Sequence, residues 1–120
     1  MILRHGVPPL RIQERIACVA RIFPYTANQN DVVPARKTIL IIEDEPHIVL
    51  GLTDALEFEG FAVVSASKGK DGVHLARQEK PDAVLLDLML PDANGFKVCE
   101  ELRRFDRFVP IIMLTARSQE

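Results

Sequence analysis

Residues 38–46 of the chain read TILIIEDEP, a short apolar run followed at once by three acidic residues and a proline. The run does not alternate with polar residues and is rich in β-branched side chains, which is typical of a strand buried on both faces of a parallel sheet. Pro46 fits the first turn of a following helix, where a missing N–H costs nothing. The stretch therefore predicts a buried strand that leads through an acidic turn into a helix.

The same alternation of short apolar runs and helical periodicity continues along the chain. Further strands are predicted at 61–66, 83–86 and 111–114, and helices follow Pro46, the second strand and the turn at 91–95. The first helix is expected to carry the apolar residues Ile48, Val49, Leu52, Leu56 and Phe58, and Gly60 fits the position just past its end. Strands that alternate with helices predict an α/β fold, a doubly wound parallel sheet whose strands end along one edge.

Composition indicates one soluble domain and excludes several classes of protein. The 120 residues are 48% hydrophobic and 27% charged, with a net charge of −2. No apolar run approaches the roughly 20 residues that span a bilayer. Cys18 and Cys99 have no metal-like spacing, which favours a reduced, cytoplasmic protein. Residues 37–120 hold fifteen acidic residues against ten basic ones, which argues against nucleic-acid binding by this part.

Residues 1–36 differ from the rest and are interpreted as an N-terminal extension, with five arginines against two acidic residues. Residues 10–23 have apolar side chains at helical spacing, which predicts an amphipathic helix that ends at Pro24. The helix could cover a face of the sheet. The polar, proline-containing linker after it favours a loose extension instead.

Acidic side chains gather at the ends of two predicted strands. Glu43 and Asp44 follow the first strand, and Asp87 follows the third. If the strand order is 2-1-3-4, as in flavodoxin-like sheets, these strands are neighbours about 4.8 Å apart and the carboxylates converge. Three carboxylates repel one another, and Mg²⁺ relieves that repulsion while it bridges to phosphate oxygens. The alternative is that the acidic residues cap the next helix, which we favour for Glu45 alone.

Three motifs together resemble the receiver domain of two-component response regulators, over about residues 37–120. They are IIEDEP at 41–46, LLDLMLPDANG at 85–95 and PIIMLTA at 110–116. Each motif alone is weak, but their order, spacing and strand context match together. Asn94 stands where the family commonly has an aspartate.

The resemblance implies a role for each matching position. Asp87 would accept a phosphoryl group from the phosphohistidine of a sensor histidine kinase. Glu43 and Asp44 would hold Mg²⁺, with Asp87 and the backbone carbonyl of Met89 as further ligands. Thr115 would be the switch hydroxyl that bonds to the phosphoryl group. Such a domain accepts a phosphoryl group and is not a turnover enzyme.

The family's domain continues beyond what this chain contains, through a fifth strand that ends in a lysine beside the acceptor. The chain ends at Glu120, and none of its residues matches that lysine. The fourth strand, 111–114, is therefore expected to be an exposed edge that favours a homodimer or strand exchange. The expected domain is incomplete, without its fifth strand and last helices.

Two other functions compete with the receiver interpretation. One is a truncated receiver fragment that binds a metal or a partner without useful phosphorylation. The other is an Mg²⁺-dependent phosphohydrolase with an aspartyl nucleophile, which we rank last. In those enzymes a threonine follows the first strand, and residues 43–46 contain none.

Overall fold

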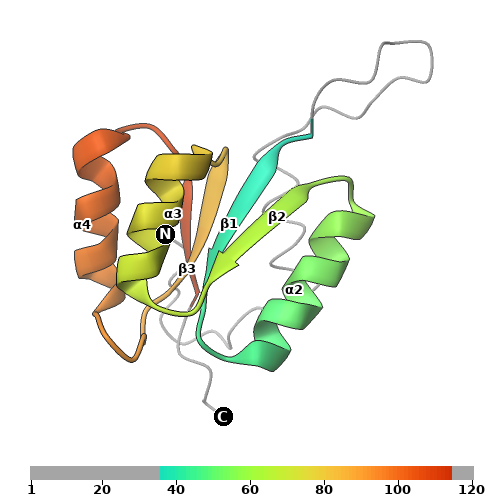
Figure 1. Cartoon of the computed structure of the whole chain (residues 1–120), viewed down its shortest axis with the longest axis horizontal. Helices are drawn as coiled ribbons and strands as arrows, with labels where there is room; N and C mark the ends of the chain where they lie inside the picture. Colours follow the sequence, from blue (N-terminus) through green and yellow to red (C-terminus); the bar gives the residue numbers. More distant parts are fainter. Residues whose placement is uncertain (1–35, 115–120) are drawn as a thin grey trace, which may run out of the picture.

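The computed structural model describes residues 36–114, which form a four-stranded parallel sheet and three helices in strict alternation (Figure 1). In chain order the elements are β1 (Thr38–Ile42), α2 (Pro46–Phe58), β2 (Ala62–Ala66), α3 (Gly69–Glu79), β3 (Ala83–Asp87), α4 (Gly95–Phe105) and β4 (Ile111–Leu114). The strand order is β2-β1-β3-β4, and every neighbouring pair is parallel. The predicted doubly wound sheet and its 2-1-3-4 order are confirmed.

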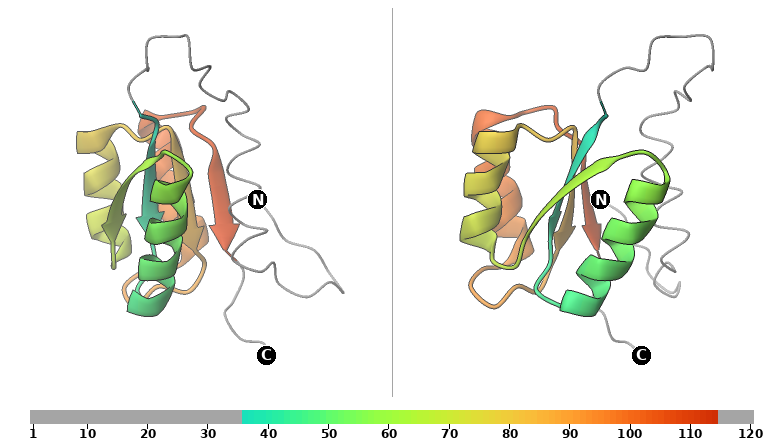
Figure 2. Two further views of the ribbon diagram at one scale, coloured as in Figure 1. Left: turned by 90° about the vertical axis from the view of Figure 1, so that its right-hand side faces the viewer. Right: turned by 45° about the vertical axis from the view of Figure 1, so that its right-hand side comes forward.

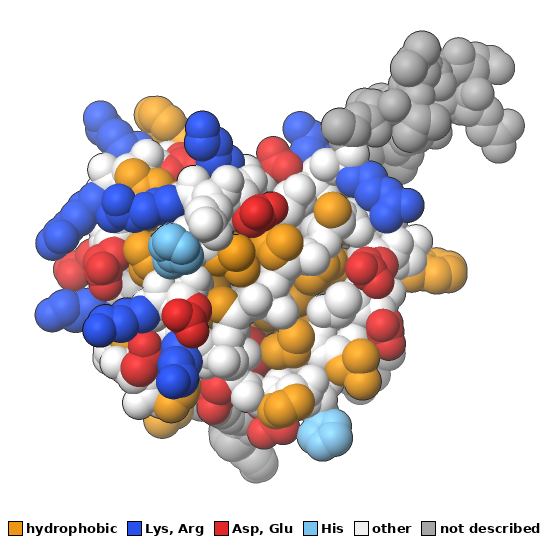
Figure 3. Space-filling view, viewed as in Figure 1, with side chains coloured by type: hydrophobic (Ala, Val, Ile, Leu, Met, Phe, Trp, Pro, Cys, Tyr) orange, Lys and Arg blue, Asp and Glu red, His pale blue; other side chains and the backbone are white. Residues whose placement is uncertain are grey.

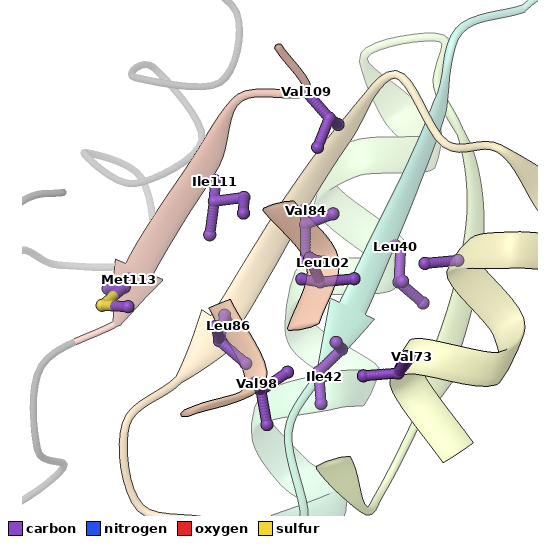
Figure 4. Close-up of a cluster of buried hydrophobic side chains, with 11 residues drawn as sticks. Leu40, Ile42, Val73, Val84, Leu86, Val98, Leu102, Val109, Ile111 and Met113 are labelled. Atoms are coloured by element: carbon purple, nitrogen blue, oxygen red, sulfur yellow. The ribbon is translucent and has the colours of Figure 1, made fainter. Parts of the chain in front are cut away.

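Helices cover both faces of the sheet, with α3 and α4 on one side and α2 on the other (Figure 2, right). Side chains of β1 and β3 that face α3 and α4 pack against Val73, Val98 and Leu102 (Figure 4). The alternate side chains of the same strands pack against Leu52 and Leu56 of α2. This double burial explains why the strands are apolar without alternation.

The two outer strands differ in burial. β2 is partly exposed along its length, whereas all four side chains of β4 are at most 8% exposed. Among the described residues, β4 pairs only with β3. The expectation that β4 mediates a homodimer or strand exchange stays a prediction.

The end of α2 confirms the predicted place of Gly60. Gly60 lies just past the helix with φ 97°, a backbone conformation that favours glycine. Phe58, the last of the apolar residues expected on this helix, is 89% exposed. It follows the buried Leu56 by two residues, which turns it to the opposite side of the helix, away from the sheet.

Polar side chains fix the edge of the sheet where the strands begin. Asp82 accepts a hydrogen bond from the Thr38 amide at 2.7 Å and so joins the start of β1 to the segment before β3. Arg103, in the last turn of α4, donates to the Val109 carbonyl at 2.6 Å and to two further carbonyls of the same loop. Asp106 accepts from the amides of Phe108 and Val109. The loop into β4 is therefore held by side chains that bond to its backbone.

Basic side chains gather over α3 and α4, at the left of the molecule in Figure 3. Arg103 and Arg104 lie in the last turn of α4, where a cation offsets the helix dipole. Arg103 also bonds to the Val109 carbonyl, so this part of the basic surface serves the end of the helix and the loop after it.

No helix of the described part of the chain is long and apolar enough to cross a membrane. The predicted helix at 10–23 and the division of the chain near residue 36 concern residues outside the described range.

Candidate metal and phosphoacceptor site

The edge where the strands end holds a cluster of three carboxylates. β1 and β3 are direct neighbours, and Ile42 pairs with Leu86. The residues that follow these partners, Glu43 and Asp87, therefore lie side by side, with Asp44 one position further. Parallel pairing of β1 with β3 is what brings together residues so far apart in the sequence.

The three carboxylates lie close enough to share one cation. One oxygen from each of Glu43, Asp44 and Asp87 lies within 4.8 Å of the others. Glu43 is 3% exposed and Asp87 1%, while Asp44 is half-buried. Hard oxygen donors grouped around one point are the ligand set that Mg²⁺ prefers. The donor set thus fits a divalent cation.

Burial and crowding alter the protonation of Glu43. Burial of its carboxyl raises the pKa to about 7, and the charge of Asp87 adds to the shift, while a hydrogen bond from the Glu45 amide opposes it. That bond, from the Glu45 N–H to Glu43 Oε2, is 3.0 Å long. Without a cation, Glu43 therefore loses its proton near neutral pH rather than in the acidic range.

The backbone after Asp87 is folded back toward its own side chain. The Met89 amide donates to Asp87 Oδ1 at 3.1 Å, which orients the carboxylate. Met89 also forms an isolated bridge with Asn94, and the Gly95 amide donates to the Leu88 carbonyl at 2.9 Å. Residues 88–95 thus form a loop closed at its base, beside the carboxylate cluster.

Comparison with known proteins now identifies the family. The family model of the response regulator receiver domain matches residues 39–120 of the chain. The chain belongs to the receiver domain family. This family is known for divalent metal binding, in agreement with the carboxylate cluster.

Curated relatives are response regulators. The chain is 44% identical over 84 residues to the alkaline phosphatase synthesis transcriptional regulatory protein PhoP of Bacillus subtilis, which covers 70% of this chain and 35% of PhoP. It is also 44% identical over 84 residues to protein PilH of Pseudomonas aeruginosa, over 68% of this chain and 69% of PilH. The receiver chain spans about a third of the length of PhoP and of similar transcriptional regulators.

Solved receiver structures share the fold. The receiver domain of HemR from Leptospira biflexa matches with a TM-score of 0.65 and 32% identity, over 71% of this chain and 68% of that one. The BeF3-activated N-terminal receiver domain of RstA from Klebsiella pneumoniae matches with a TM-score of 0.63 and 32% identity, over 70% and 71%. Both comparisons support the sheet order and the helix arrangement described above.

Two sequence predictions about this receiver site have different outcomes. Glu45 occupies the position before α2, as predicted for an anion at a helix N-terminus, but its side chain makes no capping hydrogen bond. Its backbone carbonyl accepts instead from the Ile48 and Val49 amides. Thr115 lies outside the described residues, although the residue before it, Leu114, pairs with Asp87.

Asp92 is a polar residue of the receiver domain that the sequence analysis did not single out. Its two carboxylate oxygens accept from the Gly69 and Lys70 amides, at 2.8 and 3.1 Å, in the first turn of α3. These bonds lower the pKa of Asp92. One sequence signal pointed to such a partner: Lys68 precedes α3, and a lysine side chain has no acceptor for the first amides of a helix.

Proposed function

We propose that this receiver domain accepts a phosphoryl group on Asp87 from the phosphohistidine of a sensor histidine kinase, with Mg²⁺ held by Glu43, Asp44 and Asp87. The observation that carries the proposal is the meeting of three carboxylates within 4.8 Å at the ends of β1 and β3. A bound Mg²⁺ would neutralise negative charge on the transferring phosphoryl oxygens.

The chain's own residues would orient the reaction. Asp87 is nearly fully buried, and the Met89 amide holds one of its oxygens. A carboxylate oxygen of Asp87 would form a bond to phosphorus as the phosphorus–nitrogen bond of the phosphohistidine breaks, and the electron pair returns to the imidazole. The Met89 carbonyl would be a further Mg²⁺ ligand, and Thr115 would bond to the phosphoryl group.

The proposal is tested by mass spectrometry after incubation with Mg²⁺ and acetyl phosphate. We expect a labile mass increase of one phosphoryl group on the wild-type chain and none on Asp87→Asn. Asp82→Asn is the matched control, because Asp82 is bound to a backbone amide at the opposite edge of the sheet, and we expect it to be modified like the wild type.

Two results would contradict the proposal. An equal adduct on Asp87→Asn would move the acceptor elsewhere. A folded wild-type chain that binds Mg²⁺ but forms no adduct would favour the alternative, a receiver-derived module that binds metal or a partner without phosphorylation.

A further inference from the structure

The first turn of α3 depends on a side chain from another part of the chain. Lys68 occupies the position before the helix and makes no side-chain capping bond. Asp92, from the loop between β3 and α4, instead accepts from both Gly69 and Lys70 amides. A carboxylate that binds two amides at a helix start also complements the helix dipole. The loop and α3 are therefore joined by two charge-assisted hydrogen bonds.

Close packing strengthens this junction. A Cβ atom placed on Gly69 would lie 2.8 Å from Cγ2 of Val98 and 3.0 Å from Cβ of Ala93. Only a residue without a side chain permits this approach of α3 to the loop and to α4. Figure 1 shows the loop after β3 beside the start of α3. The position of the loop is thus fixed from outside by both contact and hydrogen bonding.

Backbone contacts close the loop at its base. The Gly95 amide bonds to the Leu88 carbonyl, and Met89 bridges to Asn94. A Cβ on Gly95 would lie 2.7 Å from the Leu88 Cα, so the two backbone segments at the base of the loop lie in direct contact. The Asp92 side of the loop is therefore joined to Met89 through direct backbone contacts.

We propose that Asp92 is a positioning residue for the metal site: by anchoring the 88–95 loop to α3, it places the Met89 carbonyl for the cation. The inference rests on the proposed function, in which that carbonyl is a ligand. Asp92 itself is not one of the three clustered carboxylates, because both of its oxygens face amides of α3.

The test is the Mg²⁺ dissociation constant, measured on the folded chain by titration followed through amide chemical shifts. For Asp92→Ala we expect the constant to rise about tenfold, the usual effect of removing a group that orients a metal ligand. Asp92→Asn keeps one acceptor oxygen and should give an intermediate constant. Asp82→Ala removes a comparable long-range bond, to the Thr38 amide, and should leave the constant at the wild-type value.

Each outcome has one meaning. If Asp92→Ala binds Mg²⁺ as the wild type does, the inference is wrong. Equal losses in Asp92→Ala and Asp92→Asn would assign the effect to charge alone, and an equal loss in Asp82→Ala would assign it to general destabilisation; both overturn the inference. If Asp92→Ala does not fold, an unchanged constant in Asp92→Asn overturns it. A wild-type chain that binds no Mg²⁺ contradicts the proposed function itself.

Discussion

The sheet uses carboxylates in opposite ways where its strands begin and where they end. Where the strands begin, Asp82 and Asp106 each accept hydrogen bonds from backbone amides, and Arg103 donates to carbonyls. Where the strands end, Glu43 and Asp87 are buried beside each other, and the pKa of Glu43 is raised to about 7. Burial of the Glu43 carboxylate and the nearby charge of Asp87 both oppose its ionisation and so lower stability. The first edge thus stabilises the fold, and the second retains a repulsion that a cation would relieve.

The sharpest test of this difference is how the free energies of unfolding of Glu43→Gln and of the wild type depend on pH, in the absence of metal. In the folded chain the pKa of Glu43 is about 7, above the ordinary value of 4.5. Below pH 4.5 Glu43 is protonated in both the folded and the unfolded chain, and the stability of the fold is fully present. As the pH rises from 4.5 to 7, the unfolded chain loses the Glu43 proton more readily than the folded chain, so stability is lost. At pH 8 we expect Glu43→Gln to be more stable than the wild type by on the order of 3 kcal/mol. At pH 4 the two chains should unfold alike.

Urea unfolding at pH 4 and pH 8 measures the free energy of unfolding of both chains. Saturating Mg²⁺ should reduce the stability difference between them at pH 8. A wild-type chain as stable as Glu43→Gln at pH 8 would show that neither burial nor the charge of Asp87 destabilises the ionised Glu43.

A smaller effect is expected from Gly95→Ala, which adds a methyl group at the base of the 88–95 loop beside the carboxylate cluster. The added Cβ would lie 2.7 Å from the Leu88 Cα and 2.8 Å from the Asp87 carbonyl oxygen, and backbone atoms cannot yield without moving the loop. We expect a loss of about 2 kcal/mol in the free energy of unfolding, together with weaker Mg²⁺ binding.

Gly60→Ala is the matched control at the other edge. There a Cβ meets nothing within 4 Å, but φ is 97°, so we expect a loss of about 1 kcal/mol and unchanged Mg²⁺ binding. Loss of Mg²⁺ binding in Gly60→Ala would remove the distinction between the edges.

The smallest effect is expected from Arg103→Lys, which removes the planar donor group from the loop into β4. Arg103 bonds to the carbonyls of Asp106, Arg107 and Val109 through one nitrogen. We expect the free energy of unfolding to fall by about 1 kcal/mol, with Mg²⁺ binding and phosphorylation unchanged. Arg104→Lys, at an exposed neighbouring position, should leave the free energy of unfolding, Mg²⁺ binding and phosphorylation unchanged. Urea unfolding that ranks the two variants equally would contradict a holding role for Arg103.

The sequence was sufficient to predict the strands, the helices and the three carboxylates. Buried parallel strands have a distinctive apolar pattern, and their order places Glu43 beside Asp87. What periodicity could not predict was the partner of an individual side chain. Phe58 is one of the apolar residues expected on α2 but is exposed, and Glu45 precedes the helix without making a capping hydrogen bond. Asp92 binds amides more than twenty residues away, a contact that only the tertiary structure defines.

The central position of β1 has a consequence for how the domain folds. β1 reaches β2 across a single helix, but it reaches β3 only after the chain has passed through two helices and β2. Pairing across the longer loop has the larger entropic cost, so the β1–β2 unit forms more readily than the β1–β3 pair. Glu43 and Asp87 meet only through the β1–β3 pair. We therefore expect the carboxylate cluster to form late, so that Mg²⁺ slows unfolding without speeding the first steps of folding.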